Sequence, residues 1–197
     1  LHVRSRRQRQ MCIRDSLRNV SFKLEGLITN IRQDIQTAIE IDDLPLSREL
    51  FRQLQHVATL KSEAALFNAE SKVYNILNTQ VNPLVPTFEA ALQHLDAITY
   101  NFANLTEEQA KARDDLQKIA NDLSQPLGLL GNSIKNATYH LEHKELLNAD
   151  QIKKWEDLKQ FCEDKVEEIK SARARAAQAV VIKTTATGII KSIEPRS

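Results

Sequence analysis

The chain has 197 residues, of which 42% are hydrophobic, 27% charged and only 5% aromatic, and its formal net charge is +1. Its four Gly and five Pro argue against a β-sandwich or barrel with many turns, a glycine-rich phosphate loop and a low-complexity chain. The length suits one domain, and the composition favours a mostly helical protein.

The first sixteen residues differ in composition from the rest, because they carry five Arg while regular amphipathic spacing begins only at Leu17. A nuclear localisation patch, a basic arm for nucleic acid and a dibasic processing site are three possible interpretations of such a segment. The segment also resembles a translated sequencing adapter. The codons CGT CGG CAG CGT CAG give Arg6 to Gln10, and ATG TGT ATA AGA GAC AGN give Met11 to Ser16. We therefore interpret residues 1–16 as adapter-derived and expect them to be disordered.

Removal of this segment changes the charge and the cysteine count. Five Arg and one Asp leave the chain, so the formal net charge becomes −3. Cys162 is then the one remaining cysteine, which excludes an internal disulfide, and no Met remains. We expect residues 17–197 to form a single helical-bundle domain that is truncated at its N-terminus.

The first half of the remaining chain predicts two long helices. Apolar residues recur every three or four positions from Val20 to Ala38, which predicts a helix over about 17–41. Pro45 predicts a break at 41–46, and Ser47 is a suitable N-cap for a second helix over about 48–80. The predicted core positions of this second helix are Leu50, Leu54, Val57, Leu60, Ala64, Phe67, Val73 and Leu77.

The third and fourth helices are marked by their N-terminal sequences. Asn82 followed by Pro83 predicts a helix start, and the third helix extends to about Leu105. Thr106 to Gln109 matches a capping box, so a fourth helix begins there. Pro126 predicts a kink in it near 123–126. Its apolar seam resembles a coiled-coil stripe and comprises Leu116, Ile119, Leu123, Leu127, Leu130, Ile134, Ala137 and Leu141.

Asn148 or Asp150 can cap a fifth helix, whose stripe includes Trp155, Cys162, Val166 and Ile169. The β-branched run at 180–185 and Gly188 leave the C-terminal tail undetermined. Short loops make consecutive helices antiparallel. The predicted fold is therefore all-α: an elongated, coiled-coil-like antiparallel bundle of about five helices.

Few residues have the spacing that chemistry requires. His140 and His143 share a helix face but lack the rest of a zinc motif, so we interpret them as solvated surface residues. Cys162 and Trp155 fall on the core stripe of the fifth helix. Acidic residues alternate with Lys and Arg, which is typical of a solvated helix face. We predict no catalytic residue, no metal site and no cofactor, and an enzyme is only the third of our hypotheses.

Nucleic acid is not an expected partner. The C-terminal part is mildly basic, but aromatic residues do not interleave with its Lys and Arg, and the net charge is −3. We predict instead a non-catalytic protein that acts as a structural module or binds a protein partner or its own copies through amphipathic helices. The predicted seam comprises Leu116, Ile119, Leu123, Leu127, Leu130, Ile134, Leu141, Trp155, Cys162, Val166 and Ile169. By default such a protein is expected in the cytoplasm.

The alternative hypothesis is a toxin component. The very long helices over Ser47 to Ile182, with the stripe from Trp155 to Val166, resemble the helical pore-forming toxins of the xenorhabdolysin and haemolysin BL kind. That resemblance implies secretion and contact with a membrane through an apolar hairpin. No stretch of about eighteen apolar residues is present in this sequence, so the hairpin would belong to a missing part of the chain.

Overall fold

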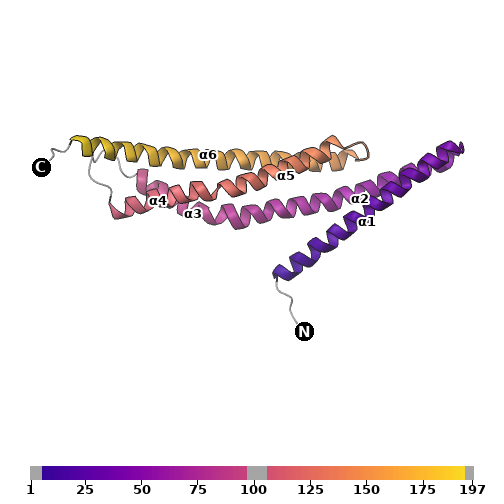
Figure 1. Ribbon diagram of the computed structural model, residues 1–197, viewed down its shortest axis with the longest axis horizontal. Helices are drawn as coiled ribbons and strands as arrows, with labels where there is room; N and C mark the ends of the chain where they lie inside the picture. The colour runs from indigo at the N-terminus through magenta and orange to yellow at the C-terminus, as the bar shows by residue number, and fades with distance from the viewer. Residues whose placement is uncertain (1–5, 97–105, 194–197) are drawn as a thin grey trace, which may run out of the picture. The chain divides into compact units, whose positions relative to one another are not determined.

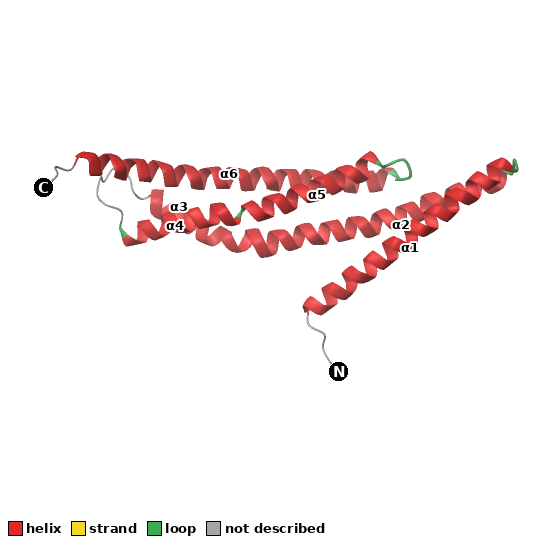
Figure 2. Cartoon of the chain, viewed as in Figure 1, coloured by secondary structure: helices red, strands yellow, loops and turns green. Residues whose placement is uncertain are grey.

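The computed structural model describes the backbone of residues 6–96 and 106–193, and the side chains of residues 15, 16, 18–94 and 106–178. Every element in these ranges is a helix (Figure 2). The fold is therefore all-α, as predicted. In chain order the α-helices are α1 (Arg6–Glu40), α2 (Leu44–Ile76), α3 (Val85–Asp96), α4 (Glu107–Asp122), α5 (Ser124–Glu142) and α6 (Ala149–Ile193) (Figure 1).

The helices form two compact units, each made of separate stretches of chain. Unit 1 contains Leu1–Lys72 and Ser133–Gln160, and unit 2 contains Val73–Asn132 and Phe161–Ser197. The predicted seam is shared between them, because Leu116 to Leu130 belong to unit 2 while Ile134, Leu141 and Trp155 belong to unit 1. Each unit has its own hydrophobic cluster.

Helix α1 begins earlier than the sequence predicts. It starts at Arg6, so residues 6–16 are helical and the expected disorder is wrong for them. Arg, Gln and Met are good helix formers, so this segment can extend the helix that follows it. The helix ends in a Schellman motif: Asp42 has φ 58°, and the Asp43 amide donates to the Ala38 carbonyl over 2.9 Å.

The start of α2 corrects the predicted cap. Asp43, rather than Ser47, caps this helix, since its Oδ1 accepts a hydrogen bond from the Leu46 amide over 3.1 Å. Pro45 then lies in the first turn, where a missing amide proton costs nothing because that amide has no partner within the helix. The predicted break is therefore a tight turn at 41–43, and the helix begins four residues earlier than expected.

The junction between α2 and α3 contains no new N-cap. A π-helical turn (Leu77–Val81) and a 3₁₀ turn (Asn82–Leu84) connect them, and Asn82 has helical φ and ψ. Its side chain donates to Asn78 Oδ1 instead of capping a helix. Pro83 cannot donate to the carbonyl four residues earlier and would clash with it, and a wider turn before it relieves that clash. The third helix is described to Asp96, and the rest of the prediction up to Leu105 lies outside the described residues.

The capping box at Thr106 is confirmed. Its hydroxyl accepts a hydrogen bond from the Gln109 amide, and the Gln109 side chain accepts one from the Thr106 amide. The predicted kink is also present, as a break of one residue at Leu123 between α4 and α5. The Leu123 amide still donates to the Ile119 carbonyl, and the Leu127 amide to the Leu123 carbonyl. The ring of Pro126 is buried and leaves the Asp122 carbonyl without its helical partner. The undetermined C-terminal tail is helical, because α6 continues to Ile193.

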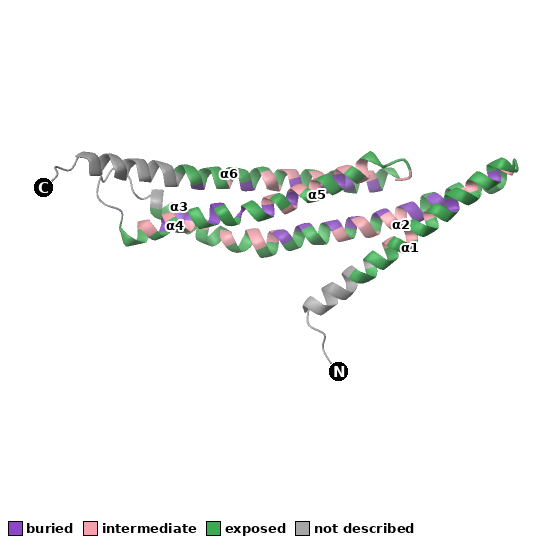
Figure 3. Cartoon of the chain, in the orientation of Figure 1, coloured by how far each residue is buried: buried purple, intermediate pink, exposed green. Residues whose placement is uncertain are grey.

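In unit 2, α3 packs against α4. Their shared cluster combines two leucines with four alanines, and Leu116 is fully buried beside alanines of α3, α4 and α6. Figure 3 shows the recurring buried positions along these helices. The cluster comprises Ala91, Leu92, Ala112, Leu116, Ala120 and Ala176, with Phe88 packed against it.

In unit 1, α1 and α2 pack as an antiparallel pair. Ile31 of α1 lies against Leu54 and Val57 of α2, and the half-buried residues beside them are Leu24, Ile28, Ile35, Leu50 and Leu146. An ion pair between Lys61 Nζ and Glu25 Oε1 (3.3 Å) marks the register of the two helices. At the spacing of this seam, the next α2 positions after Val57 are Lys61, Ala64 and Asn68, which offer α1 little apolar surface.

The contact between α1 and α2 weakens beyond Lys61 for that reason. The N-terminal part of α1 lies away from α2 in Figure 1, and Val20, which continues the apolar stripe of α1, is 45% exposed. None of the helices in the described part of the chain has a stretch long and apolar enough to cross a membrane.

We predict that Leu130→Ala lowers the free energy of unfolding by about 2 to 5 kcal/mol, because Leu130 has no exposed surface and its truncation leaves a cavity. Chemical denaturation followed by circular dichroism measures the loss. Ile39→Ala is the matched control, since Ile39 is 53% exposed and its truncation should change stability by less than about 1 kcal/mol. Equal stability of Leu130→Ala and the unmodified protein would remove Leu130 from the core.

Candidate functional site

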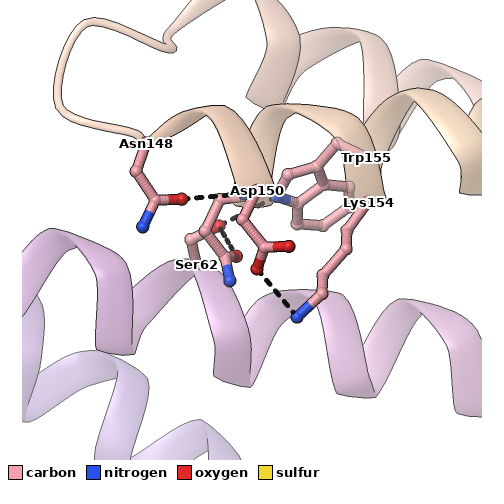
Figure 4. A network of polar contacts seen from close by, with 6 residues as sticks. Ser62, Asn148, Asp150, Lys154 and Trp155 are labelled. Carbon is pink, nitrogen blue, oxygen red and sulfur yellow. Dashed lines mark hydrogen bonds and ion pairs between the residues drawn. The ribbon is translucent and has the colours of Figure 1, made fainter.

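The most elaborate arrangement of polar side chains in the described structure lies in the core of unit 1. The indole Nε1 of Trp155 donates a hydrogen bond to Ser62 Oγ over 2.9 Å, and the Ser62 hydroxyl donates to Gln151 Oε1 over 2.9 Å. All three side chains are buried, so these bonds join α6 to α2 away from solvent (Figure 4). Because the indole N–H and the Ser62 hydroxyl both donate within it, the network stabilises one arrangement of the two helices.

The N-cap of α6 determines where the residues of this network lie. Asn148 Oδ1 accepts a hydrogen bond from the Gln151 amide over 2.9 Å, which confirms Asn148 as the N-cap of α6. Asp150 instead binds Lys154 over 3.1 Å on the exposed side of the first turn. The cap sets where α6 begins, and therefore directs Gln151 and Trp155, four residues apart, to the same face.

An aromatic cluster covers one side of Trp155. The imidazole of His140 stacks on the indole at 4.1 Å between ring centroids and 11° between planes. Tyr139 lies 4.3 Å from the ring of His143, and His143 Nδ1 is 2.9 Å from the Tyr139 carbonyl oxygen. His140 is therefore half-buried against the core, and its interpretation as a solvated residue is wrong, whereas His143 is exposed.

The environment of His140 favours its neutral form. Burial lowers the pKa of His140 below its ordinary value of 6.5, and the positive charge of Lys61 and the nearby His143 lower it further. Neither histidine belongs to a group of three or more metal-ligating side chains in the described part of the chain. The pair therefore lacks the ligand set of a metal site.

Cys162 of unit 2 is a structural thiol. It is fully buried, and burial followed by the charge of Glu163 raises its pKa to about 11. Since the thiolate is the nucleophilic form, such a pKa leaves very little reactive sulfur at neutral pH. Its environment suits a small hydrophobic side chain.

The predicted seam residues differ in burial. Leu116, Ile119, Leu123, Leu130, Trp155, Cys162 and Ile169 are buried, and Leu127, Ile134, Leu141 and Val166 are half-buried. Helix α2 departs furthest from its predicted stripe. Leu54, Val57 and Val73 are buried as expected, but Leu60 is 41% exposed and Phe67 54% exposed.

Sequence reasoning missed the polar residues of the core. Ser62 and Gln151 are buried although neither lies on a predicted apolar stripe. The available signal was a row of small residues, because Ala58, Ser62 and Ala69 fall on one face of α2 together with Leu66. That row is the second buried face of the helix. Leu60 and Phe67 lie on neither of the two buried faces, so they are exposed to solvent.

Comparison of the chain with models of protein families, with curated proteins and with solved structures finds no match.

We predict that unit 1 loses stability as the pH falls below about 6.5, because the unfolded chain takes up a proton that folded His140 resists. The single tryptophan, Trp155, reports this locally, since a protonated imidazole stacked on the indole quenches its fluorescence. The fluorescence titration should have its midpoint below 6.5 and should vanish in His140→Gln, while His143→Gln retains it. A midpoint above 6.5 would mean that attraction between the cationic imidazole and the indole outweighs burial, and would contradict the prediction.

Proposed function

We propose that this protein is a non-catalytic module that acts by binding other helices, from a protein partner or from further copies of itself. The observation that carries the proposal is the exposed apolar stripe on α2. Leu46, Leu60 and Phe67 are 43%, 41% and 54% exposed and lie at multiples of seven residues, so they share one face of the helix. Large apolar side chains repeated on one face are typical of helix–helix interfaces.

Two features of the site support this proposal over catalysis. The buried polar side chains of unit 1 already bond to one another, so their hydrogen-bonding capacity is used within the fold. The buried thiol of Cys162 has a raised pKa, which disfavours its use as a nucleophile. Both arrangements stabilise helix packing, which is what a rigid binding surface needs.

The test removes the stripe and leaves the fold intact. The double variant Leu60→Ser/Phe67→Ser should keep its helical circular dichroism and nearly all of its stability, because both side chains are already exposed. Its self-association in sedimentation velocity, or its capture of partners from an extract of the source organism, should fall at least fivefold. Phe51→Ser is the matched control, since Phe51 is 45% exposed but lies half a turn away from Leu60. If the double variant and the unmodified protein associate identically in both assays, the proposal fails.

A second candidate function, a component of a pore-forming toxin, is favoured by the turn between α1 and α2. Ile39, Ile41, Leu44 and Leu46 are all at least 43% exposed there, which concentrates large apolar side chains at the end of a helical hairpin. Such an apolar end can bind the interface of a bilayer, while the hairpin that crosses it would belong to a part of the protein outside this sequence. Release of a trapped dye from liposomes tests this candidate, and Ile41→Asp/Leu44→Asp should reduce any release at least tenfold. Liposomes that stay intact with the unmodified protein contradict it.

A further inference from the structure

The exposed stripe of α2 continues a groove that already exists between α1 and α2. The groove is about 520 Å³ in volume, and α1 contributes Leu27, Asn30, Ile31 and Asp34 to its walls. From α2 come Leu50, Gln53, His56 and Val57, with Glu49 and Arg52 at its edge. Its floor is apolar and its edges are polar, which is the arrangement found where an amphipathic helix lies between two others.

Both helices extend the groove in the same direction. On α2, Leu60 and Phe67 follow Gln53 at intervals of seven residues, so they lie on the same face of the helix as this groove residue. On α1, Val20 precedes Leu27 by seven residues and is 45% exposed. Because the helices are antiparallel, in the register marked by the pair of Glu25 and Lys61, these two extensions lie at the same end. On α2 the apolar surface is thus continuous with the established contact between α1 and α2, while on α1 it continues along the part of the helix that lies away from α2.

The edge of the groove on α2 carries three acidic residues and one histidine at a regular interval. Glu49, His56, Glu63 and Glu70 are spaced by seven residues, and all four are exposed. Glu49 forms an ion pair with Arg52. No ion pair to Glu63 or Glu70 is seen within the described ranges. The nearby Lys154 is bound to Asp150, which raises the pKa of Lys154 more than Glu63 and Glu70 do. The part of the groove beyond His56 therefore has an acidic edge.

We propose that this groove binds an amphipathic helix of a partner protein that carries Lys or Arg along one edge of its apolar face. The inference rests on the proposed function and specifies its partner. A helix in the groove would cover Leu60, Phe67 and Val20 with its apolar residues and place its cations opposite Glu63 and Glu70. The distance from Leu50 to Phe67 is about 26 Å along α2, so a partner segment of about 20 residues suffices. Charge on the edge selects the partner and its orientation, while burial of the apolar face supplies most of the affinity.

Two synthetic peptides of about 21 residues serve as probes. Both carry Leu at the a and d positions of three heptads, and one has Lys and the other Glu at the e and g positions. We expect fluorescence anisotropy with the full chain to show that the Lys peptide binds at least tenfold more tightly than the Glu peptide. Phe67→Lys should abolish binding of the Lys peptide, whereas the matched control Phe51→Lys should bind it normally. Glu63→Lys/Glu70→Lys should reverse the preference between the peptides.

The outcomes separate this inference from the proposed function. Equal binding of the two peptides, or equal effects of Phe67→Lys and Phe51→Lys, would overturn the acidic groove as a site while leaving helix binding elsewhere intact. If the chain alone forms a dimer in sedimentation velocity, and Phe67→Lys makes it monomeric, a second copy covers the groove and the partner assignment is wrong. If the Leu60→Ser/Phe67→Ser variant also associates like the unmodified protein, the proposed function fails as well.

Discussion

The packing of unit 1 depends on how α2 divides its surface. One row of its side chains, Leu50, Leu54 and Val57, faces α1, and a second buried row contains Ser62, which reaches Trp155 of α6. A helix has 3.6 residues per turn, so two packed rows still leave a third uncovered. Leu60 and Phe67 lie on that third row, and their exposure follows from the use of the other two faces.

The hydrogen bonds of Ser62 explain how a serine and a glutamine are tolerated in this core. A buried hydroxyl or amide without a partner would cost about 1 to 3 kcal/mol, but here the indole N–H, the hydroxyl and the amide oxygen are joined by hydrogen bonds. A donor and an acceptor at fixed positions bond in the register that brings Ser62 to both Gln151 and Trp155. His140 stacks on the same indole. Protonation of its imidazole would place a positive charge against Trp155 and disturb the packing of α6 on α2.

The acidic edge and the apolar floor of the groove have different roles in the proposed interaction. Apolar surface attracts any amphipathic helix, so it cannot select a partner by itself. Exposed carboxylates such as Glu63 and Glu70 disfavour an acidic helix and favour a basic one, although each contributes little at an exposed site. Selection would thus come from the edge, and affinity from Leu60 and Phe67.

Much of the local structure follows from the sequence alone. The capping box at Thr106 and the kink near Pro126 were predictable, and the cap of α6 was narrowed to Asn148 or Asp150, because each depends on residues within one turn of the chain. The all-α class followed from apolar residues repeated at helical spacing. The cap of α2 was not predicted, because Asp43 and Ser47 are both suitable caps and the choice depends on how the turn after α1 closes.

The faces of α2 could be decided only by tertiary structure. Leu60, Phe67 and Val57 all satisfy the same periodicity, and periodicity records that a residue is apolar without recording which neighbour covers it. The burial of Ser62 and the exposure of Phe67 depend on the positions of α1 and α6, which lie far away in the sequence. The sequence by itself determined that this protein is built of amphipathic helices. Only the packing of those helices against one another decided which apolar residues form the core and which remain available to a partner, because burial is a property of pairs of surfaces.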